Sequence, residues 1–302
     1  MRIYLDCLPC FLRQTLDAVR FVTPDEQIHE KVMRQVLELV GSIDPRQTPP
    51  AIGQQIHRVI RRMTGNADPY RQRKQDSNML AMRLYPQLKE RIRDARRPLE
   101  TAVRLAIAGN VMDFGLYSSM DVDHVREAVE SALADGCDAG CLEEFTQAVN
   151  EARDILYLGD NAGEIVFDRL LIEELPPGKV TFVVKGSPIL NDATGEDARM
   201  TGLTDIVDVV ENGSDAPGTL LQDCSAQFHQ RFARSDLVIA KGQGNYESLN
   251  EVDKAMFFLL RAKCPVIAAD LACAVGQMIL RRHDGAGRTV HCGRKEQTDA
   301  RF

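Results

Sequence analysis

The spacing of apolar residues divides the chain into two parts. Up to about residue 133, apolar positions recur every three to four residues, which is the period of an amphipathic helix. Thr23-Pro24 and Thr48-Pro49 are helix-start signals, and Gly41 and Gly65 are stop signals. The apolar stripes are Ile28-Val32-Val36-Leu39, Ile52-Ile56-Val59-Met63, Leu80-Leu84-Leu88-Ile92 and Leu99-Val103-Ile107. We therefore predict an N-terminal helical subdomain over residues 1–150.

From residue 154 onward, short apolar runs alternate with helical patterns. The predicted strands are 154–158, 180–184, 205–210, 236–240 and 265–269, and the predicted helices are 164–174, 217–234, 247–262 and 271–281. Such alternation indicates an α/β fold in which right-handed crossovers join parallel strands and helices cover both faces of the sheet. We predict this second domain over residues 151–282. The polar, aperiodic residues 283–302 are predicted to form a flexible tail.

Composition narrows the classes of function. The chain has 302 residues, a mass of 33.7 kDa and a formal net charge of −7, and it contains no tryptophan. The negative charge argues against nucleic acid or an anionic membrane as a partner. No apolar run approaches the roughly 20 residues that span a bilayer, and the N-terminus lacks the apolar core of a secretory signal. We expect a cytoplasmic protein with mostly reduced cysteines and a small-molecule partner, and the sequence does not fix its oligomeric state.

Two close cysteine pairs are candidates for metal or redox chemistry. Cys7 and Cys10 form a Cys-Leu-Pro-Cys motif before a predicted helix, and Cys137 and Cys141 flank a glycine-containing turn. The four thiols are compatible with a zinc or redox site. Because the motif lacks zinc-ribbon spacing, burial as small apolar side chains is the interpretation that we favour.

Polar motifs follow three of the predicted strands. They are Gly-Asp160-Asn161-Ala-Gly-Glu, Lys-Gly-Ser-Pro-Ile-Leu-Asn-Asp192-Ala-Thr and Lys241-Gly242-Gln-Gly-Asn245-Tyr-Glu. In a parallel sheet, these loops open at the same edge and can converge on one ligand.

The residue types in these loops suit a divalent cation and a phosphate. Asp160, Asn161 and Asp192 offer oxygen ligands, which suit Mg²⁺ or Mn²⁺, with Ni²⁺ or Co²⁺ as further possibilities. Lys241 and the backbone N–H groups near Gly242 are candidates for binding phosphate. Asp160, Asp192 and Lys241 are therefore our candidate catalytic residues, acting in phosphoryl transfer or hydrolysis.

Two interruptions of the helical region add candidates for lining a substrate pocket. Residues 66–70, Asn-Ala-Asp-Pro-Tyr, and residues 109–115, Gly-Asn-Val-Met-Asp-Phe-Gly, do not read as plain helix. Turn residues of this kind often satisfy only their local backbone. We nevertheless predict that Asn110 and Asp113, together with Asn245, contact the substrate.

These motifs make the chain similar to the damage-control phosphatases, formerly a domain of unknown function numbered 89. The matching segments are LGDNAGE at 158–164, KGSPILNDAT at 185–194, KGQGNYE at 241–247, DPY at 68–70 and GNVMDFG at 109–115. The N-terminal cysteine pair resembles that of a microbial subgroup. The resemblance implies a three-layer α/β/α sandwich with a helical N-terminal part. It also implies a metal-dependent phosphatase of small metabolites, with metal on Asp160, Asn161 and Asp192 and phosphate on Lys241.

Two alternatives to a phosphatase stay open. One is an S-adenosyl-ligand-dependent carboxyl methyltransferase, although the turn at 159–163 does not meet the glycine-rich nucleotide fingerprint. The other is a non-catalytic metal- or phosphate-binding module that uses the cysteine pair. Within the phosphatase reading, position 162 is Ala, so no second acid stands two residues after Asp160, and we expect direct attack by water.

Overall fold

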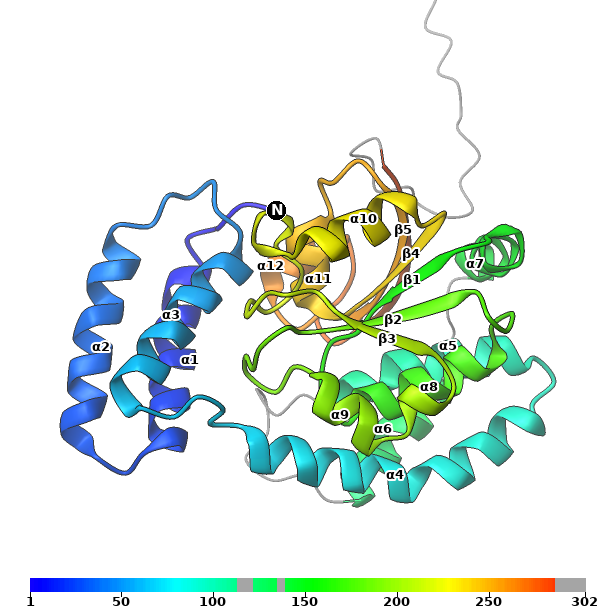
Figure 1. The fold of residues 1–302 in the computed structure, drawn as a ribbon, viewed down its shortest axis with the longest axis horizontal. Helices are drawn as coiled ribbons and strands as arrows, with labels where there is room; N and C mark the ends of the chain where they lie inside the picture. Colours follow the sequence, from blue (N-terminus) through cyan, green and yellow to red (C-terminus); the bar gives the residue numbers. More distant parts are fainter. Residues whose placement is uncertain (113–121, 135–138, 286–302) are drawn as a thin grey trace, which may run out of the picture.

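The computed structural model describes residues 1–112, 122–134 and 139–285. Three helices come first, and in Figure 1 they stand beside the rest of the molecule: α1 (Cys7–Val22), α2 (Glu26–Gly41) and α3 (Pro49–Thr64). The predicted signals of α3 hold, since Thr48 is its N-cap with Pro49 in the first turn and Gly65 ends it with φ of 68°. Helix α2 instead begins two residues after Pro24, where Asp25 caps it by accepting the Gln27 N–H. The apolar stripes of the three helices form a core of their own around Val36 and Ile60.

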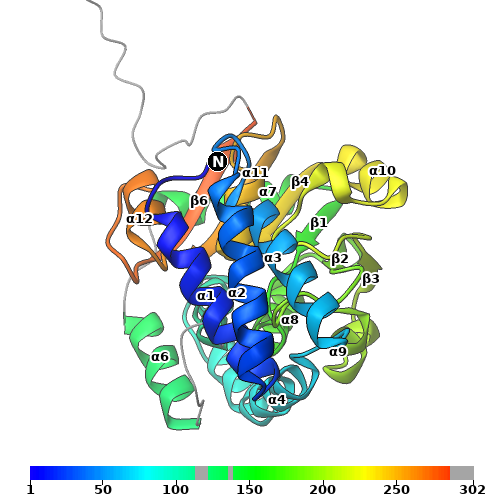
Figure 2. The same cartoon turned by 90° about the vertical axis from the view of Figure 1, so that its left-hand side faces the viewer.

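A second group of helices lies on one face of the sheet. It consists of α4 (Arg71–Arg93), α5 (Pro98–Ala108), the 3₁₀ turn η1 (Gly109–Met112), α6 (Val122–Ala134) and α7 (Ala139–Glu151). Of these helices, α5 and α7 contact strands, and α4 and α6 pack on α5. Their apolar residues share one hydrophobic core with one face of the sheet. Figure 1 shows α4 running beneath the sheet, and Figure 2 shows α1–α3 in front of it. The domain boundary at residue 150 stays a prediction.

The sheet has six strands in the order β3-β2-β1-β4-β5-β6. The strands are β1 (Ile155–Leu158), β2 (Val180–Val184), β3 (Asp208–Glu211), β4 (Leu237–Lys241), β5 (Ala255–Arg261) and β6 (Met278–Asp284). The first five run parallel, and β6 pairs antiparallel to β5 at the edge. The carboxyl ends of the five parallel strands therefore lie at one edge of the sheet.

Helices cover both faces of this sheet, so the fold is the expected α/β/α sandwich. The connecting helices are α8 (Glu164–Glu174), α9 (Gly195–Met200), α10 (Ala226–Arg234), α11 (Gly242–Leu249) and α12 (Pro265–Asp270). In β4, Leu237 and Ile239 face the core with α4, α5 and α8, whereas Val238 and Ala240 face the core with α10–α12. By the same alternation, Lys241 points toward α8.

Several predicted elements of the last third are wrong. Residues 255–261, predicted within a helix, form β5, and residues 265–269, predicted as a strand, form α12. The segment 278–281 belongs to β6 rather than to a helix, and the helix predicted from 217 begins only at Ala226. A strand buried on both faces has the same continuous apolar run as a buried helix, so periodicity does not separate the two.

The structure bears on two further expectations, the flexible tail from residue 283 and the lack of a membrane-spanning segment. Residues 283 and 284, assigned to the tail, belong to β6, and the tail from 286 lies outside the described residues. Within the described part of the chain, none of the helices combines the length and apolar character needed to cross a bilayer.

Candidate functional site

The loops after β1 and β2 bring the three predicted metal ligands together. Asn161 and Asp192 face each other in an isolated antiparallel bridge between the two loops. Backbone hydrogen bonds hold the loops in register, from Ala162 N to Asn191 O and from Ala193 N to Asp160 O, both at 2.8 Å. Asp160, Asn161 and Asp192 are all buried, with exposures of 7%, 3% and 3%. The sequence-predicted ligand set is therefore one local cluster.

Hydrogen bonds orient the Asn161 amide within this cluster. Its Nδ2 donates to Asp160 Oδ2 at 2.9 Å and to Glu164 Oε2 at 2.8 Å. With both N–H bonds used, the carbonyl Oδ1 is the atom left to act as a ligand. Two carboxylates and an amide oxygen form a hard-oxygen donor set, which fits Mg²⁺ or Mn²⁺.

Gly242 permits the approach of Asp160 to the loop after β4. The β1–β4 register pairs Leu158 with Ala240, so Asp160 and Gly242, each two residues further along, lie at the same level just beyond the strands. A Cβ atom on Gly242 would lie 1.8 Å from Asp160 Oδ2, and the residue has φ of 79°. Only glycine combines this backbone conformation with so close a neighbour.

Lys241 lies behind the cluster and is fully buried. Its Nζ donates to Glu164 Oε1 and Asp168 Oδ1, both at 2.6 Å, and to Ala106 O at 2.8 Å. These bonds use all three N–H groups of the ammonium, so in this structure none is directed at a phosphate. The contacts instead connect Lys241 to Asn161 through Glu164.

The buried charges around Lys241 shift one another's pKa values. Burial raises the pKa of Asp168 to about 6, because the charged carboxylate loses its hydration, and Lys241 partly opposes the rise. Burial alone would lower the pKa of Lys241, but the Asp168 and Glu164 carboxylates raise it above its usual value. The Tyr157 hydroxyl donates to Asp168 Oδ1 at 2.8 Å, and burial followed by the nearby Asp168 charge raises the pKa of Tyr157.

The other predicted substrate contacts are held by the protein itself. Asn110 Nδ2 donates to Glu164 Oε2 at 3.1 Å. Asn245 Nδ2 donates to the carbonyls of Lys241 at 2.8 Å and Gly159 at 3.2 Å, and thus fixes the β4 loop to the β1 loop. Asp113 lies outside the described residues. Substrate contacts by these residues stay a prediction.

Lys185, Glu164 and Asp168 are site residues that sequence reasoning did not single out. The Lys185 Nζ lies 3.3 Å from Asp192 Oδ2, and its side chain is nearly buried. Glu164 and Asp168 follow Asp160 at successive four-residue steps into α8. The sequence could have identified both acids, because residues at that spacing share one face of a helix and acids are unusual among apolar neighbours.

The first turns of α4, which follow the break at residues 66–70, contact α9 and the turn before α8. Lys74 Nζ lies 3.1 Å from Asp68 Oδ2 and 3.3 Å from Asp197 Oδ2. Asn78 Oδ1 accepts the Gly163 N–H at 2.6 Å. The start of α4 therefore contacts the α/β part of the fold, and Asn78 supports the turn that carries Asp160 and Asn161.

The described cysteines of the two predicted pairs lie in different parts of the fold. Cys7 and Cys10 occupy the first turn of α1, whereas Cys141 is buried in the core beneath the sheet, and Cys137 is not among the described residues. Within the described ranges, no group of three or more His, Cys, Asp or Glu side chains is arranged to hold a metal. The Asp160 cluster, with two carboxylates and one amide, does not belong to that category.

The fold and the cluster define a class: an α/β/α protein with a candidate oxygen-ligand site at the carboxyl edge of a parallel sheet. Residues 3–279 match the family described as the damage-control phosphatase ARMT1-like domain, and the chain belongs to this family. A damage-control phosphatase of Pyrococcus horikoshii is 35% identical over 94% of this chain and 99% of its own. One of Archaeoglobus fulgidus is 32% identical over 93% and 99%.

A solved structure agrees with this assignment. The crystal structure of a Pyrococcus horikoshii protein of the family formerly numbered 89 has a TM-score of 0.85 to this chain, at 34% identity. The match covers 94% of this chain and 99% of that one. The similarity of fold and the names of the relatives support a phosphatase.

Proposed function

We propose that the protein is a metal-dependent phosphatase that hydrolyses phosphate monoesters of small metabolites. The observation that carries the proposal is the convergence of Asp160, Asn161 and Asp192 across the β1 and β2 loops. Membership of a phosphatase family supports the same reaction class. Mg²⁺ or Mn²⁺ is the metal that the oxygen donors suit, with Ni²⁺ and Co²⁺ as alternatives.

Within this proposal, Asp160, Asn161 and Asp192 hold the ion, which when bound neutralises phosphate charge and activates water. Glu164 orients the Asn161 amide, and Lys241 neutralises the Glu164 and Asp168 carboxylates behind it. Lys185, next to Asp192, is the nearest ammonium to the predicted ligands and is assigned to bind phosphate alongside the backbone N–H groups of the loops. Because its three N–H groups are engaged, Lys241 has to exchange an acceptor before it contacts phosphate.

The nucleophile in this proposal is water rather than a carboxylate. Ala162 is fully buried and apolar, so Asp160 has no acid two residues on to protonate a leaving group in a phospho-enzyme route. Asp160 is also braced by the Asn161 amide and by the Gly242 backbone. A carboxylate fixed in this way is suited to hold a ligand in place.

The test is hydrolysis of a generic aryl phosphate by purified protein with added Mg²⁺ or Mn²⁺. Asp160→Ala is expected to abolish metal-dependent turnover with an unchanged circular dichroism spectrum. Asp17→Ala, an exposed acid on α1, is the matched control and is expected to keep full activity. Turnover of Asp160→Ala at the level of the unaltered protein would refute the proposal.

Calorimetry separates the methyltransferase alternative. Tight binding of an S-adenosyl ligand in the absence of metal would favour a transferase, whereas metal binding that is lost in Asp160→Ala supports the phosphatase. A panel of phosphorylated metabolites, screened with several divalent ions, then defines the substrate.

A further inference from the structure

A pocket lies between α3 and the loops that follow β2 and β3. It has a volume of about 690 Å³ and mixes arginines with two aspartates and small residues. Its lining consists of Arg58, Arg61, Arg62, Gly65, Ala67, Ser187, Pro188, Gly213, Asp215 and Asp223. A Cβ atom on Gly65 would meet no other atom within 4 Å, so this side of the pocket is open.

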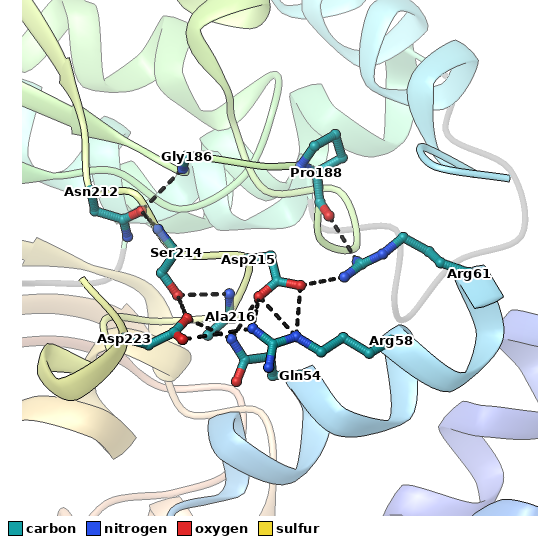
Figure 3. A network of polar contacts seen from close by, with 10 residues as sticks. All are labelled: Gln54, Arg58, Arg61, Gly186, Pro188, Asn212, Ser214, Asp215, Ala216 and Asp223. Atoms are coloured by element: carbon teal, nitrogen blue, oxygen red, sulfur yellow. Dashed lines mark hydrogen bonds and ion pairs between the residues drawn. The ribbon is translucent and has the colours of Figure 1, made fainter. Parts of the chain in front are cut away.

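Two of the arginines are fixed by partners and form the rigid wall of the pocket. Arg58 Nε donates to Asp215 Oδ2 at 3.0 Å, and its guanidinium also lies 3.6 Å from Asp223. Arg61 Nη1 donates to Pro188 O at 2.9 Å and also pairs with Asp215. Figure 3 shows these contacts joining α3 to both loops.

Arg62 differs from its two neighbours. It lies four residues after Arg58, on the same side of α3, and its side chain is exposed. Among the described residues, it makes no hydrogen bond and no ion pair, although it lines the pocket. Among the described residues that line the pocket, three arginines stand against two aspartates, Asp215 and Asp223, which leaves one positive charge in excess.

The pocket lies close to the metal-ligand cluster. Pro188 and Asp192 belong to one loop and are four residues apart, so their Cα atoms are at most about 14 Å from each other. Gly213 follows the carboxyl end of β3, at the same sheet edge as the cluster. The Pro188 end of the pocket therefore lies within about 14 Å of Asp192, and the inference below requires a substrate that extends from the cluster into the pocket.

We infer that the substrate carries a second anionic group, a carboxylate or another phosphate, which binds in this pocket at Arg62. The inference rests on the proposed phosphatase function. Arg58 and Arg61 hold the loop in place as positioning residues, and Arg62 is the specificity-determining residue. A guanidinium is suited to this because its fork of N–H groups matches both carboxylate and phosphate oxygens.

The test compares substrates with and without a second anionic group. Arg62→Glu and Arg62→Ala are assayed on a generic aryl phosphate, a phosphorylated sugar acid, a sugar bisphosphate and the matching neutral sugar monophosphate. Arg13→Glu, an exposed arginine on α1, is the matched control for the charge change. Aryl phosphate turnover also shows whether the phosphatase itself is intact.

Arg62→Ala is expected to raise KM for the two doubly anionic substrates by about fivefold, and Arg62→Glu by more, because an ion pair is lost and then reversed. Neither variant should change kcat, or KM for the neutral sugar phosphate and the aryl phosphate. A larger effect on the sugar acid identifies a carboxylate, and a larger effect on the bisphosphate a second phosphate. Equal KM changes on all substrates, or none on the doubly anionic ones, would overturn the inference. If the unaltered protein does not hydrolyse the aryl phosphate, the phosphatase proposal itself is refuted.

Discussion

The Asn161 amide donates to the Glu164 carboxylate over 2.8 Å, and the other oxygen of that carboxylate accepts from Lys241 at 2.6 Å. One acid therefore connects a candidate metal ligand to a fully buried ammonium. The arrangement is typical of outer-shell groups, which fix the orientation of ligands without touching the ion. We therefore assign Glu164 a positioning role, which measurements of metal affinity can separate from catalytic turnover.

Glu164→Gln should weaken metal binding while the fold persists. The substitution removes the charged acceptor of one of the two Asn161 N–H groups, so the affinity for Mn²⁺ is expected to fall by about tenfold or more. Calorimetric titration with Mn²⁺ measures this directly, and turnover should recover largely at saturating metal. Glu90→Gln, an exposed acid on α4, is the control. An unchanged dissociation constant in Glu164→Gln would show that the contact has no positioning role.

Gly242→Ala should damage the site more than the fold. The added Cβ would lie 1.8 Å from Asp160 Oδ2, so the carboxylate has to move, and the positive φ adds strain. A displacement of about 1 Å can reduce turnover about 100-fold. Aryl phosphate hydrolysis and thermal unfolding are measured together. Gly41→Ala, where the new Cβ meets nothing within 4 Å, is the control. Full activity in Gly242→Ala would contradict the structure at this contact.

Asp168 makes the stability of the protein depend on pH in a defined direction. Its pKa is about 6 in the folded state and 3.8 in an ordinary setting, so the folded state holds the proton more tightly. The stabilisation from this group is complete below pH 3.8 and is lost as the pH rises through 6.

Asp168→Asn removes this contribution to the pH dependence of stability, because the asparagine side chain does not titrate. The free energy of unfolding of the variant, relative to the unaltered protein, should rise by about 2 kcal/mol between pH 4 and pH 6. Urea unfolding of both proteins at a series of pH values measures these free energies. Subtracting one from the other cancels the contribution of the other acids. A difference that stays flat, or falls, across this range would contradict the assigned pKa.

The sequence predicted that Asp160, Asn161 and Asp192 lie close together, but it did not predict which residues support them. Asp160, Asn161 and Asp192 are predictable because parallel topology puts strand-end loops at one edge. The burial of Lys241 follows from its parity with Leu237 and Ile239 in β4, which is defined only once the two faces of the sheet are known. A lysine before Gly-x-Gly suits a phosphate contact and a buried ion pair equally well.

The wrong elements near the C-terminus have a related cause. The run 255–261, Ala-Met-Phe-Phe-Leu-Leu-Arg, is rich in residues that also favour helices, and burial on both faces of the sheet decides the outcome. In α12, Pro265 occupies the first turn, where its missing N–H has no cost, although Val266 and Ile267 favour a strand. Contacts far along the chain override local preference in both segments.

The Cys7–Cys10 pair provides the last prediction, which concerns the non-catalytic metal-binding alternative. Burial, with smaller contributions from Cys264 and Glu247, raises the pKa of both thiols, and in the described part of the chain no group of three His, Cys, Asp or Glu side chains is arranged to hold a metal. We therefore expect the double variant Cys7→Ser and Cys10→Ser to lose about 1 kcal/mol of stability, with aryl phosphate turnover unchanged. Protein purified under reducing conditions should contain no stoichiometric zinc, as measured by elemental analysis. Zinc at one equivalent, released by the double substitution, would instead make the first turn of α1 a structural metal site, because only deprotonated thiolates bind zinc with such affinity.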